Sequence, residues 1–318
     1  MKYTLLVLIS ISIHFVSAQT MRTVALYNVE NLYDTIDDPS RNDSEFLPAA
    51  EHQWNSTKYF EKLKHINQVL DKMDDPLIIG LVEIENANVV RDIVKHSTRM
   101  KDKYGVVHYD SPDARGVDVA MIYDSSTLKL LESGFIRYTL PDTAYSATRD
   151  IVWAKYKKGK DVFYSFVNHW PSRRSGEKES EKNRIIAATA ARKFIDSLLT
   201  INKDVKIIFM GDLNDHPEDA APQMIYEKLT QMIYPKSGEF GGSYCYKNKW
   251  EIIDHMMVSP SFLTNKKMKV VADSGKIHSF DFLITEYKGV KMPFRTYAKD
   301  YLGGYSDHLP VSFQINMK

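Results

Sequence analysis

Six apolar segments of this chain each meet acids, amides or histidines at one end, and this pattern constrains the fold more than any other sequence feature. The segments are rich in Val, Ile, Phe and Tyr, which favour buried positions in β-strands. The polar residues at their ends are Asn28 and Glu30, Glu83, Asn168 and His169, Asp212, Asn214 and Asp215, Asp254 and His255, and Asp307 and His308. Charged side chains beside buried strands are costly unless they are paired or bind a metal. One shared site at the edge of a sheet would account for all six ends.

Eight segments predict strands and three predict helices. The strands are expected at Thr23–Asn28, Leu77–Glu83, Val117–Tyr123, Ile151–Tyr156, Val162–His169, Val205–Asp212, Ile252–Ser259 and Val311–Ile315. The helices, with apolar residues at three- and four-residue steps, are expected at Lys58–Met73, Ala87–His96 and Glu177–Leu199. The apolar stripe of the first helix is expected to contain Phe60, Leu63, Ile66, Leu70 and Met73. Strands that alternate with helices favour an α/β or α+β fold.

Two long segments have neither the apolar pattern of a strand nor that of a helix. Asp34–Trp54 is polar and irregular, and so is Asp273–Tyr305 apart from a hairpin expected around Phe280–Tyr287. Long irregular segments inside compact domains are often functional loops. No linker rich in Gly, Pro or Ser divides the chain, so one domain is expected over residues 19–318.

The first 18 residues have the pattern of a secretory signal peptide. A positive charge at Lys2 precedes an apolar run from Leu5 to Val16, and small residues lead to a cleavage site after Ala18. The run is too short for a membrane span, which needs roughly 20 residues. No later segment is long and apolar enough to span a bilayer. The sequence therefore predicts a secreted protein, either extracellular or periplasmic.

Charge and cysteine content limit how the mature chain can bind and be stabilised. Without residues 1–18 the chain loses one basic residue, Lys2, and keeps 41 basic and 41 acidic residues. A neutral protein has no general attraction for polyanions, so any such binding must come from a local cluster. A single cysteine, Cys245, cannot form an internal disulfide, so stability must come from burial. We expect a monomer without a stable protein partner.

Each polar strand end also has an ordinary explanation when taken alone. The residues around Asp212 suit a turn, Glu83 suits a helix start, and an isolated His169 is more often structural than catalytic. The joint occurrence of all six ends is what favours a site.

The six motifs together resemble the endonuclease/exonuclease/phosphatase superfamily, which has the fold of pancreatic deoxyribonuclease. The matching stretches are Tyr27-Asn28-Val29-Glu30-Asn31-Leu32, Leu81-Val82-Glu83, Asn168-His169-Trp170-Pro171-Ser172, Gly211-Asp212-Leu213-Asn214-Asp215, Ile253-Asp254-His255 with Ser259, and Ser306-Asp307-His308-Leu309-Pro310. The second departs from the family, which more often has Gln before the Glu. Asp113–Ala120 also resembles the secreted, nuclease-like members. The resemblance implies a four-layer α/β sandwich, in which two mixed β-sheets pack face to face between outer helices.

The resemblance also implies a metal site and a group that activates water. Glu83 is the expected metal ligand, and Glu30 and Asp307 are its expected neighbours, direct or through water. Magnesium takes few carboxylates and keeps several waters, so it suits this sparse set, with Mn²⁺ or Ca²⁺ as alternatives. Asp212 is expected to orient or deprotonate the attacking water.

Neutral donors and histidines are the implied contacts to phosphate. Asn28 and Asn214 would hold phosphate oxygens or the attacking water. His308 would act as a cation whose tautomer is fixed by Asp254. His169 would be a second phosphate contact, or the acid that protonates the leaving oxygen.

The substrate remains open between three readings. A secreted nuclease is favoured, with Arg115, Arg173 and Arg174 expected to contact phosphate. A face of the following helix is expected to extend this basic cluster with Lys178, Lys182 and Arg184. The alternatives are a phosphodiesterase or phosphatase for a phospholipid, as in sphingomyelinases, or for a small phosphorylated substrate. The third reading, a binding module without catalysis, is disfavoured because every motif is intact.

Overall fold

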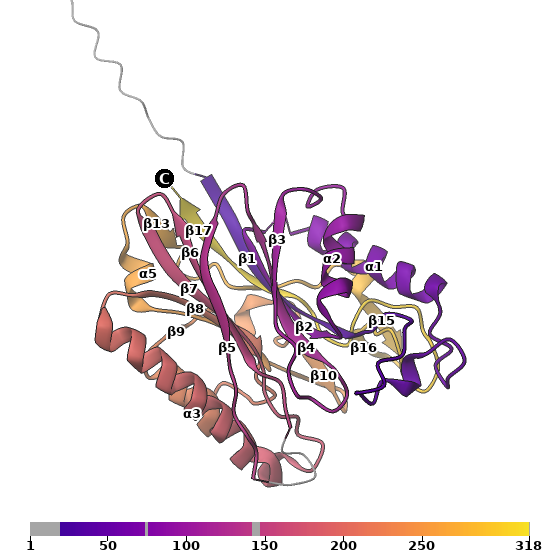
Figure 1. Ribbon diagram of the computed structural model, residues 1–318. Coiled ribbons are helices and arrows are strands. Elements are labelled where there is room, and N and C mark those ends of the chain that lie inside the picture. The colour runs from indigo at the N-terminus through magenta and orange to yellow at the C-terminus, as the bar shows by residue number, and fades with distance from the viewer. Residues whose placement is uncertain (1–19, 74–75, 142–146, 318) are drawn as a thin grey trace, which may run out of the picture.

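Two mixed β-sheets form the centre of the computed structural model, which describes residues 20–73, 76–141 and 147–317 (Figure 1). The expected signal peptide lies outside the described residues. The first sheet contains, in spatial order, β13 (Met268–Val270), β17 (Val311–Met317), β1 (Thr20–Leu32), β2 (Ile78–Ile84), β4 (Asp118–Asp124) and β3 (Tyr104–His108), with β14 (Lys276–Ile277) also paired to β17. The second contains β5 (Lys129–Ile136), β6 (Ile151–Lys158), β7 (Asp161–His169), β8 (Lys206–Asp212), β12 (Asp254–Val258) and β9 (Thr230–Gln231).

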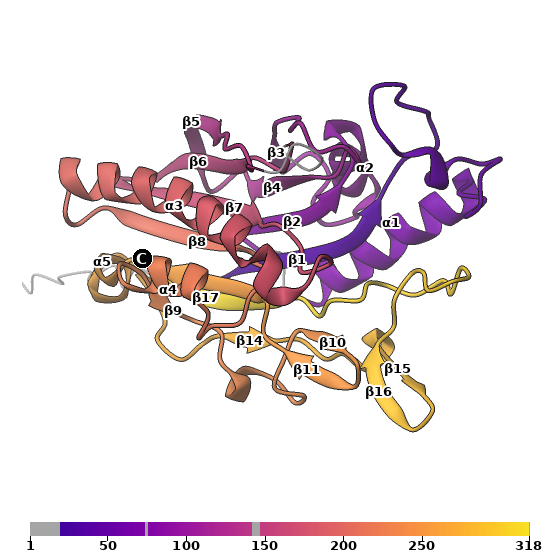
Figure 2. The ribbon, with the colours of Figure 1, turned by 90° about the horizontal axis from the view of Figure 1, so that it is seen from below.

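Helices cover the outer faces of both sheets, as the predicted four-layer sandwich requires (Figures 1 and 2). The helices are α1 (Ser56–Asp71), α2 (Ala87–His96), α3 (Glu177–Ile201), α4 (Ala220–Tyr226) and α5 (Pro260–Thr264). Apolar residues of α1 and α2 join the main core, and those of α3 form a second core with the outer face of β7 and β8. Two hairpins stand apart from the sheets, β10 (Tyr244–Tyr246) with β11 (Lys249–Glu251), and β15 (Ile284–Tyr287) with β16 (Val290–Pro293).

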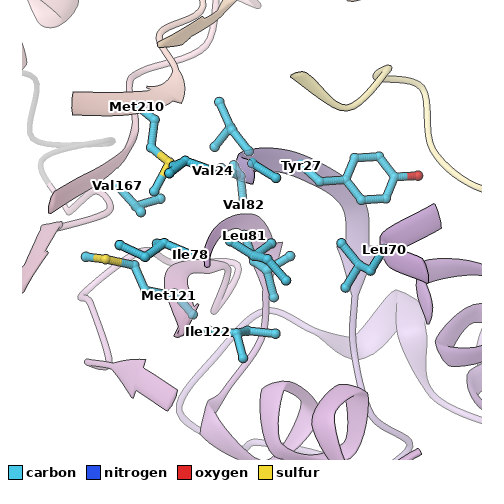
Figure 3. Close-up of a cluster of buried hydrophobic side chains, with 14 of the residues drawn as sticks. Val24, Tyr27, Leu70, Ile78, Leu81, Val82, Met121, Ile122, Val167 and Met210 are labelled. Carbon is cyan, nitrogen blue, oxygen red and sulfur yellow. The ribbon is translucent and has the colours of Figure 1, made fainter. Parts of the chain in front are cut away.

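The two sheets pack tightly against each other where β2 faces β7 and β8. A Cβ atom added to Gly80 of β2 would lie 3.0 Å from the side chains of both Met210 and Val167. In Figure 3 the side chains of Met210 and Val167 point toward Val24 and Ile78 of the opposite sheet. A glycine at this position therefore lets large apolar side chains fill the space between the sheets without a cavity.

All eight predicted strands and all three predicted helices are present, with the predicted bounds for Ala87–His96 and shifted ends for the others. The strands that the sequence did not reveal are short or lie at edges. β3 and β5, for example, are only partly buried and lack a continuous apolar run.

The predicted hairpin around Phe280–Tyr287 is wrong in position. The observed hairpin spans Ile284–Pro293, and its turn contains Lys288 and Gly289, whose φ angles are positive at 51° and 78°. Glycine adopts such angles without steric cost, so the turn forms there. The residues before it, Asp281–Leu283, form a 3-10 turn instead.

The predicted stripe of α1 is wrong at one position. Phe60 is 50 % exposed, and the buried stripe runs through Tyr59, Leu63 and Ile66. Lys62 is buried beside this stripe, which a hydrophobic pattern could not anticipate. Within the described residues no helix combines the length and apolar character needed to cross a bilayer.

We expect the protein to lose stability in mild acid because His278 is buried as a neutral ring. Burial lowers its pKa to about 4, and nearby Lys276 adds to the effect. Unfolding would restore the ordinary pKa near 6.5, so the free energy of unfolding should fall by about 3 kcal/mol between pH 6.5 and 4. Protonation would also place a proton on Nδ1, which has no hydrogen-bond partner among the described residues. Urea unfolding at pH 7 and pH 4.5 measures the effect.

His278→Gln should reduce this pH dependence, and His96→Gln at an exposed position of α2 is the matched control. Equal pH dependence in both variants would contradict the assignment to His278.

Candidate active site

Three predicted site residues lie side by side on neighbouring strands of the second sheet. β7 runs parallel to β8 and pairs His169 with Asp212, and β12 runs antiparallel to β8 and pairs Asp254 with the same residue. The ends of β7 and β8 therefore meet the start of β12 at one sheet edge. Gly211 permits this packing, because a Cβ atom there would lie 2.5 Å from the carbonyl oxygen of Asn168.

The first sheet supplies residues at two irregular strand ends. The pairing of β1 with β2 shifts register after Asn28, and that of β2 with β4 shifts after Val82. Glu30 and Glu83 lie at these shifts, with positive φ angles of 54° and 63°. Asn214, which follows β8 in the second sheet, also has a positive φ angle, of 53°. Positive φ is costly for residues other than glycine, and such strained residues cluster at functional sites. The bulges turn the side chains away from the regular alternation of the strands.

Asp212 lies at the centre of the assembled site. Its Oδ2 accepts a hydrogen bond from Asn28 Nδ2 at 3.0 Å, and its Oδ1 accepts one from the backbone N–H of Asn214 at 3.0 Å. The Nε2 atoms of His308 and His169 lie 3.7 and 3.9 Å from Oδ2. Burial raises the pKa of Asp212 to about 7, although the positive charge of His308 opposes the shift. This carboxyl can therefore gain or lose a proton near neutral pH.

His308 and Asp254 form a buried ion pair. His308 Nδ1 and Asp254 Oδ2 are 2.8 Å apart, and the hydroxyl of Ser243 donates to the same Asp254 oxygen at 2.7 Å. Burial alone would lower the pKa of His308, but Asp254 and Asp212 raise it well above the ordinary value. The two carboxylates therefore favour the protonated, positively charged form of His308.

His169 is neutral, in contrast to His308. Burial lowers its pKa well below the ordinary value, and the charges of Arg149 and Arg115 lower it further. Its Nδ1 is buried without a hydrogen-bond partner among the described residues, and its Nε2 lies 3.9 Å from Glu83 Oε1. A neutral imidazole is a poor acid, so this environment favours a hydrogen-bonding contact over protonation of a leaving group.

Glu83 offers carboxylate oxygens, the type of ligand that a hard divalent cation prefers. Its Oε2 accepts a hydrogen bond from the backbone N–H of Asn31 at 3.1 Å, which orients the carboxylate, while Oε1 faces His169. Oxygen ligands in small number suit Mg²⁺. A second group of potential ligands, Asp212, Asp254 and His308, lies close together. Because His308 is protonated and paired there, it cannot also donate a lone pair to a metal.

Glu30 and Asp307, the other predicted metal neighbours, are joined by a residue that the sequence did not single out. Arg295 donates to Glu30 Oε1 at 2.9 Å and to Asp307 Oδ2 at 3.1 Å. Burial and the charge of Asp307 raise the pKa of Glu30 to about 7. The amine of Lys62 is buried nearby, and burial lowers its pKa to about 8. The sequence pattern indicated a place at the site for neither basic residue, because Arg295 lies in an irregular segment and Lys62 in a helix.

Tyr244 is a further side chain at the site that the sequence analysis missed. Its ring centroid lies 4.7 Å from that of His308, and an isolated bridge joins the two residues. Burial raises the pKa of Tyr244. The charge of Asp307 raises it further, and the charge of Arg295 opposes the shift. Tyr244 lies far from His308 in the chain and next to no motif, so no pattern in the sequence could have placed it there.

The predicted basic cluster is only partly present. Arg184 is 1 % exposed and pairs with Asp215 at 2.6 Å, so the prediction that it extends an exposed basic face is wrong. Arg173 forms an ion pair with Glu251. Arg174 is exposed, as are Lys178 and Lys182 in the first turns of α3. The helix turns Arg184 inward because it lies on the buried face of α3 with Ala187, Ala188 and Ala191.

Arg115 lies beside the candidate metal ligand. Burial alone would lower its pKa, but the charges of Glu83 and Asp113 raise it. Its Nε lies 3.7 Å from Asp113 Oδ1, and about a third of the side chain is exposed at 34 %. This position is compatible with the predicted contact to substrate phosphate.

Comparison with known proteins identifies similar sequences and similar folds. The model of the endonuclease/exonuclease/phosphatase family matches residues 23–317. No curated protein sequence matches the chain. Among solved structures, a protein of this family from Bacteroides thetaiotaomicron has 17 % identity and a TM-score of 0.62, with 95 % of this chain and 99 % of the other covered.

Two further structures share the fold at similar distance. A mannosyl-6-phosphatase of Bacteroides thetaiotaomicron has 17 % identity and a TM-score of 0.61, covering 92 % of this chain and 99 % of its own. TDP2 of D. rerio, complexed with single-strand DNA product, has 15 % identity and a TM-score of 0.58, covering 94 % and 100 %. At this level of identity the likeness concerns the fold.

Proposed function

This chain belongs to the endonuclease/exonuclease/phosphatase family, and from that premise we propose that it is a divalent-metal-dependent nuclease that hydrolyses phosphodiester bonds by attack of water. The observation that carries the proposal is the arrangement around Asp212, where a carboxyl of near-neutral pKa lies between a charged and a neutral histidine. We further propose export of the mature protein, on the basis of the signal peptide pattern in residues 1–18.

Glu83 would hold the metal ion in this proposal. The bound ion would supply positive charge that neutralises the phosphate and stabilises the charge that develops on its oxygens. Arg115 lies near Glu83, because the charge of Glu83 raises the pKa of Arg115 more than any other carboxylate does. It would add a charge-assisted contact to a phosphate oxygen.

Asp212 would orient the attacking water and take its proton. General bases work best when their pKa lies near the operating pH, and burial brings the pKa of Asp212 to about 7. Asn28 Nδ2 and the backbone N–H of Asn214 hold the carboxylate in place through both of its oxygens. The side chain of Asn214 is itself held by the carbonyl of Trp170 at 3.1 Å.

The two histidines would divide the contacts to phosphate. His308 offers the fixed positive charge, and Asp254 orients its ring through Nδ1. His169 offers a neutral N–H, since its pKa is far below the ordinary value. Fixed dipoles and charges of this kind stabilise a transition state without the reorganisation that water would need.

We expect Asp254 and His308 to act as one unit. Asp254→Asn and His308→Gln should each lower kcat by about 10²- to 10⁴-fold. The double variant should lose little more than either single variant, because loss of either partner removes the oriented imidazolium. A double-mutant cycle on kcat measures the coupling. Additive losses would show that the two residues contribute independently.

Exposed basic residues next to the site support a nucleic acid as the substrate. Arg174, Lys178 and Lys182 lie between the end of β7 and the first turns of α3, close in sequence to His169. They can neutralise a few phosphates beyond the one that is cleaved. TDP2 of D. rerio, which shares the fold, is complexed with single-strand DNA product.

A small phosphorylated substrate is the second candidate, and one observation favours it. Two of the six basic residues expected to contact phosphate already form ion pairs within the protein, Arg173 with Glu251 and Arg184 with Asp215. Three exposed basic residues of this cluster remain, Arg174, Lys178 and Lys182, which are few for binding a polymer. A mannosyl-6-phosphatase has the same fold.

Salt dependence of binding should report the size of this footprint. With three exposed basic residues the slope of log affinity against log salt should be about −3, at about −0.9 for each phosphate neutralised on duplex DNA. Arg174→Ala with Lys178→Ala should reduce its magnitude by about 2. Binding is measured in an inactive Asp212→Asn background at fixed magnesium. Lys193→Ala, farther along α3, is the matched control and should leave the slope unchanged.

A substrate panel tests the proposed function. Purified protein with magnesium is incubated with duplex DNA, single-stranded DNA, RNA, a sugar 6-phosphate and sphingomyelin. The proposal predicts cleavage of at least one nucleic acid at a rate well above that of the monoester. Hydrolysis of the sugar phosphate alone would establish the second candidate, and hydrolysis of none would remove the proposed activity.

A further inference from the structure

Arg295 occupies the space between two carboxylates that the sequence assigned to a metal. Its Nη2 lies 2.8 Å from Glu30 Oε1 and 3.1 Å from Asp307 Oδ2, and its Nε donates to Glu30 Oε1 at 2.9 Å. The other oxygen of Glu30 accepts from the backbone N–H of Thr296 at 2.5 Å. Both oxygens of Glu30 are therefore already engaged by groups of the chain itself.

A second buried cation faces the same carboxylates. Lys62 of α1 is 1 % exposed, and its Nζ donates to Thr296 Oγ1 and to the carbonyl of Tyr305. Glu30 and then Asp307 are the carboxylates that act most strongly on its charge. Arg295 therefore pairs directly with both carboxylates, and Lys62 adds a buried amine whose charge they stabilise.

Backbone contacts hold Arg295 in this position. The carbonyl of Phe294 accepts hydrogen bonds from the backbone N–H groups of Tyr305, at 2.6 Å, and of Ser306, at 3.2 Å. These contacts close a loop that carries Arg295 at one end and Asp307 at the other. The same closed loop therefore carries both Arg295 and its partner Asp307.

We infer that Arg295 is the resident cation of the Glu30–Asp307 pair, filling the position of a second divalent ion, so that the chain holds one metal ion, at Glu83. The inference rests on the proposed function, which supplies the ion at Glu83. A divalent ion placed between Glu30 and Asp307 would meet the positive charges of Arg295 and Lys62 at short range, where repulsion is strong. A guanidinium also keeps its charge at all accessible pH values.

Metal stoichiometry tests the inference independently of catalysis. Mn²⁺ is titrated into the folded protein by isothermal calorimetry. Wild type and Arg295→Lys should bind one ion, and Arg295→Gln should bind two, because the freed carboxylates then form a second site. Adding Asp307→Asn to Arg295→Gln should return the count to one. Arg192→Gln is the matched control, since Arg192 also contacts two carboxylates, those of Asp196 and Glu227.

The outcomes separate this inference from the proposed function. Two ions in wild type, or one ion in Arg295→Gln with wild-type affinity, would overturn the role of Arg295 while leaving the metal at Glu83 intact. No binding by folded wild type would remove the metal itself and with it the proposed function. If Arg295→Gln does not fold, the counts for wild type and Arg295→Lys still decide, because two ions in either contradicts the inference.

Discussion

Replacing Asp212 by asparagine is expected to lower kcat by about 10²- to 10⁴-fold, the range that a general base contributes. The amide has nearly the same shape and can still accept a hydrogen bond from Asn28 or Asn214, so the fold should persist. It cannot take a proton from water. Because the metal is assigned to Glu83, the affinity for Mn²⁺ should remain close to that of wild type. Steady-state kinetics on the best substrate of the panel, with calorimetry for the metal, measures both quantities.

Asp204→Asn serves as the control for this variant. Asp204 is exposed just before β8, at the end of the strand opposite to Asp212. It should leave both kcat and metal affinity unchanged. A large loss of metal affinity in Asp212→Asn would instead assign the ion to the group of Asp212, Asp254 and His308.

Replacing Glu83 by glutamine is expected to have the opposite signature. The amide keeps an oxygen that can accept the hydrogen bond from Asn31, so the turn at Glu83 should be retained. Loss of the charge should weaken metal binding strongly and lower kcat by about 100- to 1,000-fold, as removal of one transition-state stabilising group does. Part of the loss should be recovered at high metal concentration. Calorimetry and kinetics over a range of magnesium concentrations measure these effects.

Glu132→Gln, at an exposed position of β5, is the control for the change of charge. Wild-type metal affinity in Glu83→Gln would show that another residue holds the ion. Full activity of Glu83→Gln in the presence of a chelator would rule out a metal role for Glu83.

The sequence could predict that the central residues of the site lie at strand ends, because each of them follows or begins a recognisable buried strand. Buried strands are recognisable as apolar runs, and the residue that follows each run must lie at the sheet edge. His169, Asp212 and Asp254 are brought together by direct pairing of β7, β8 and β12. The pairing itself is long-range information that the sequence does not contain, so the shared site was expected from the joint occurrence of the polar ends and from the family resemblance.

The sequence could not predict the charged residues that the tertiary structure brings in. Arg295 binds Glu30, and Lys62 binds Thr296 beside Arg295, although the loop and the helix that carry them lie more than two hundred residues apart in the chain. Arg184 looked like one more surface cation of α3, and only its pairing with Asp215 shows that it is structural. Burial of a charge depends on its partner, which a local pattern does not contain.

Metal-dependent turnover of a phosphodiester is the measurement that tests the central claim most directly. The purified protein is stripped with a chelator and assayed on the best nucleic acid of the panel before and after magnesium is restored, beside Asp212→Asn as the inactive reference. The account predicts no turnover above this reference without metal and full turnover once magnesium is added. Turnover that persists without metal, or that Asp212→Asn retains at the wild-type rate, would contradict it.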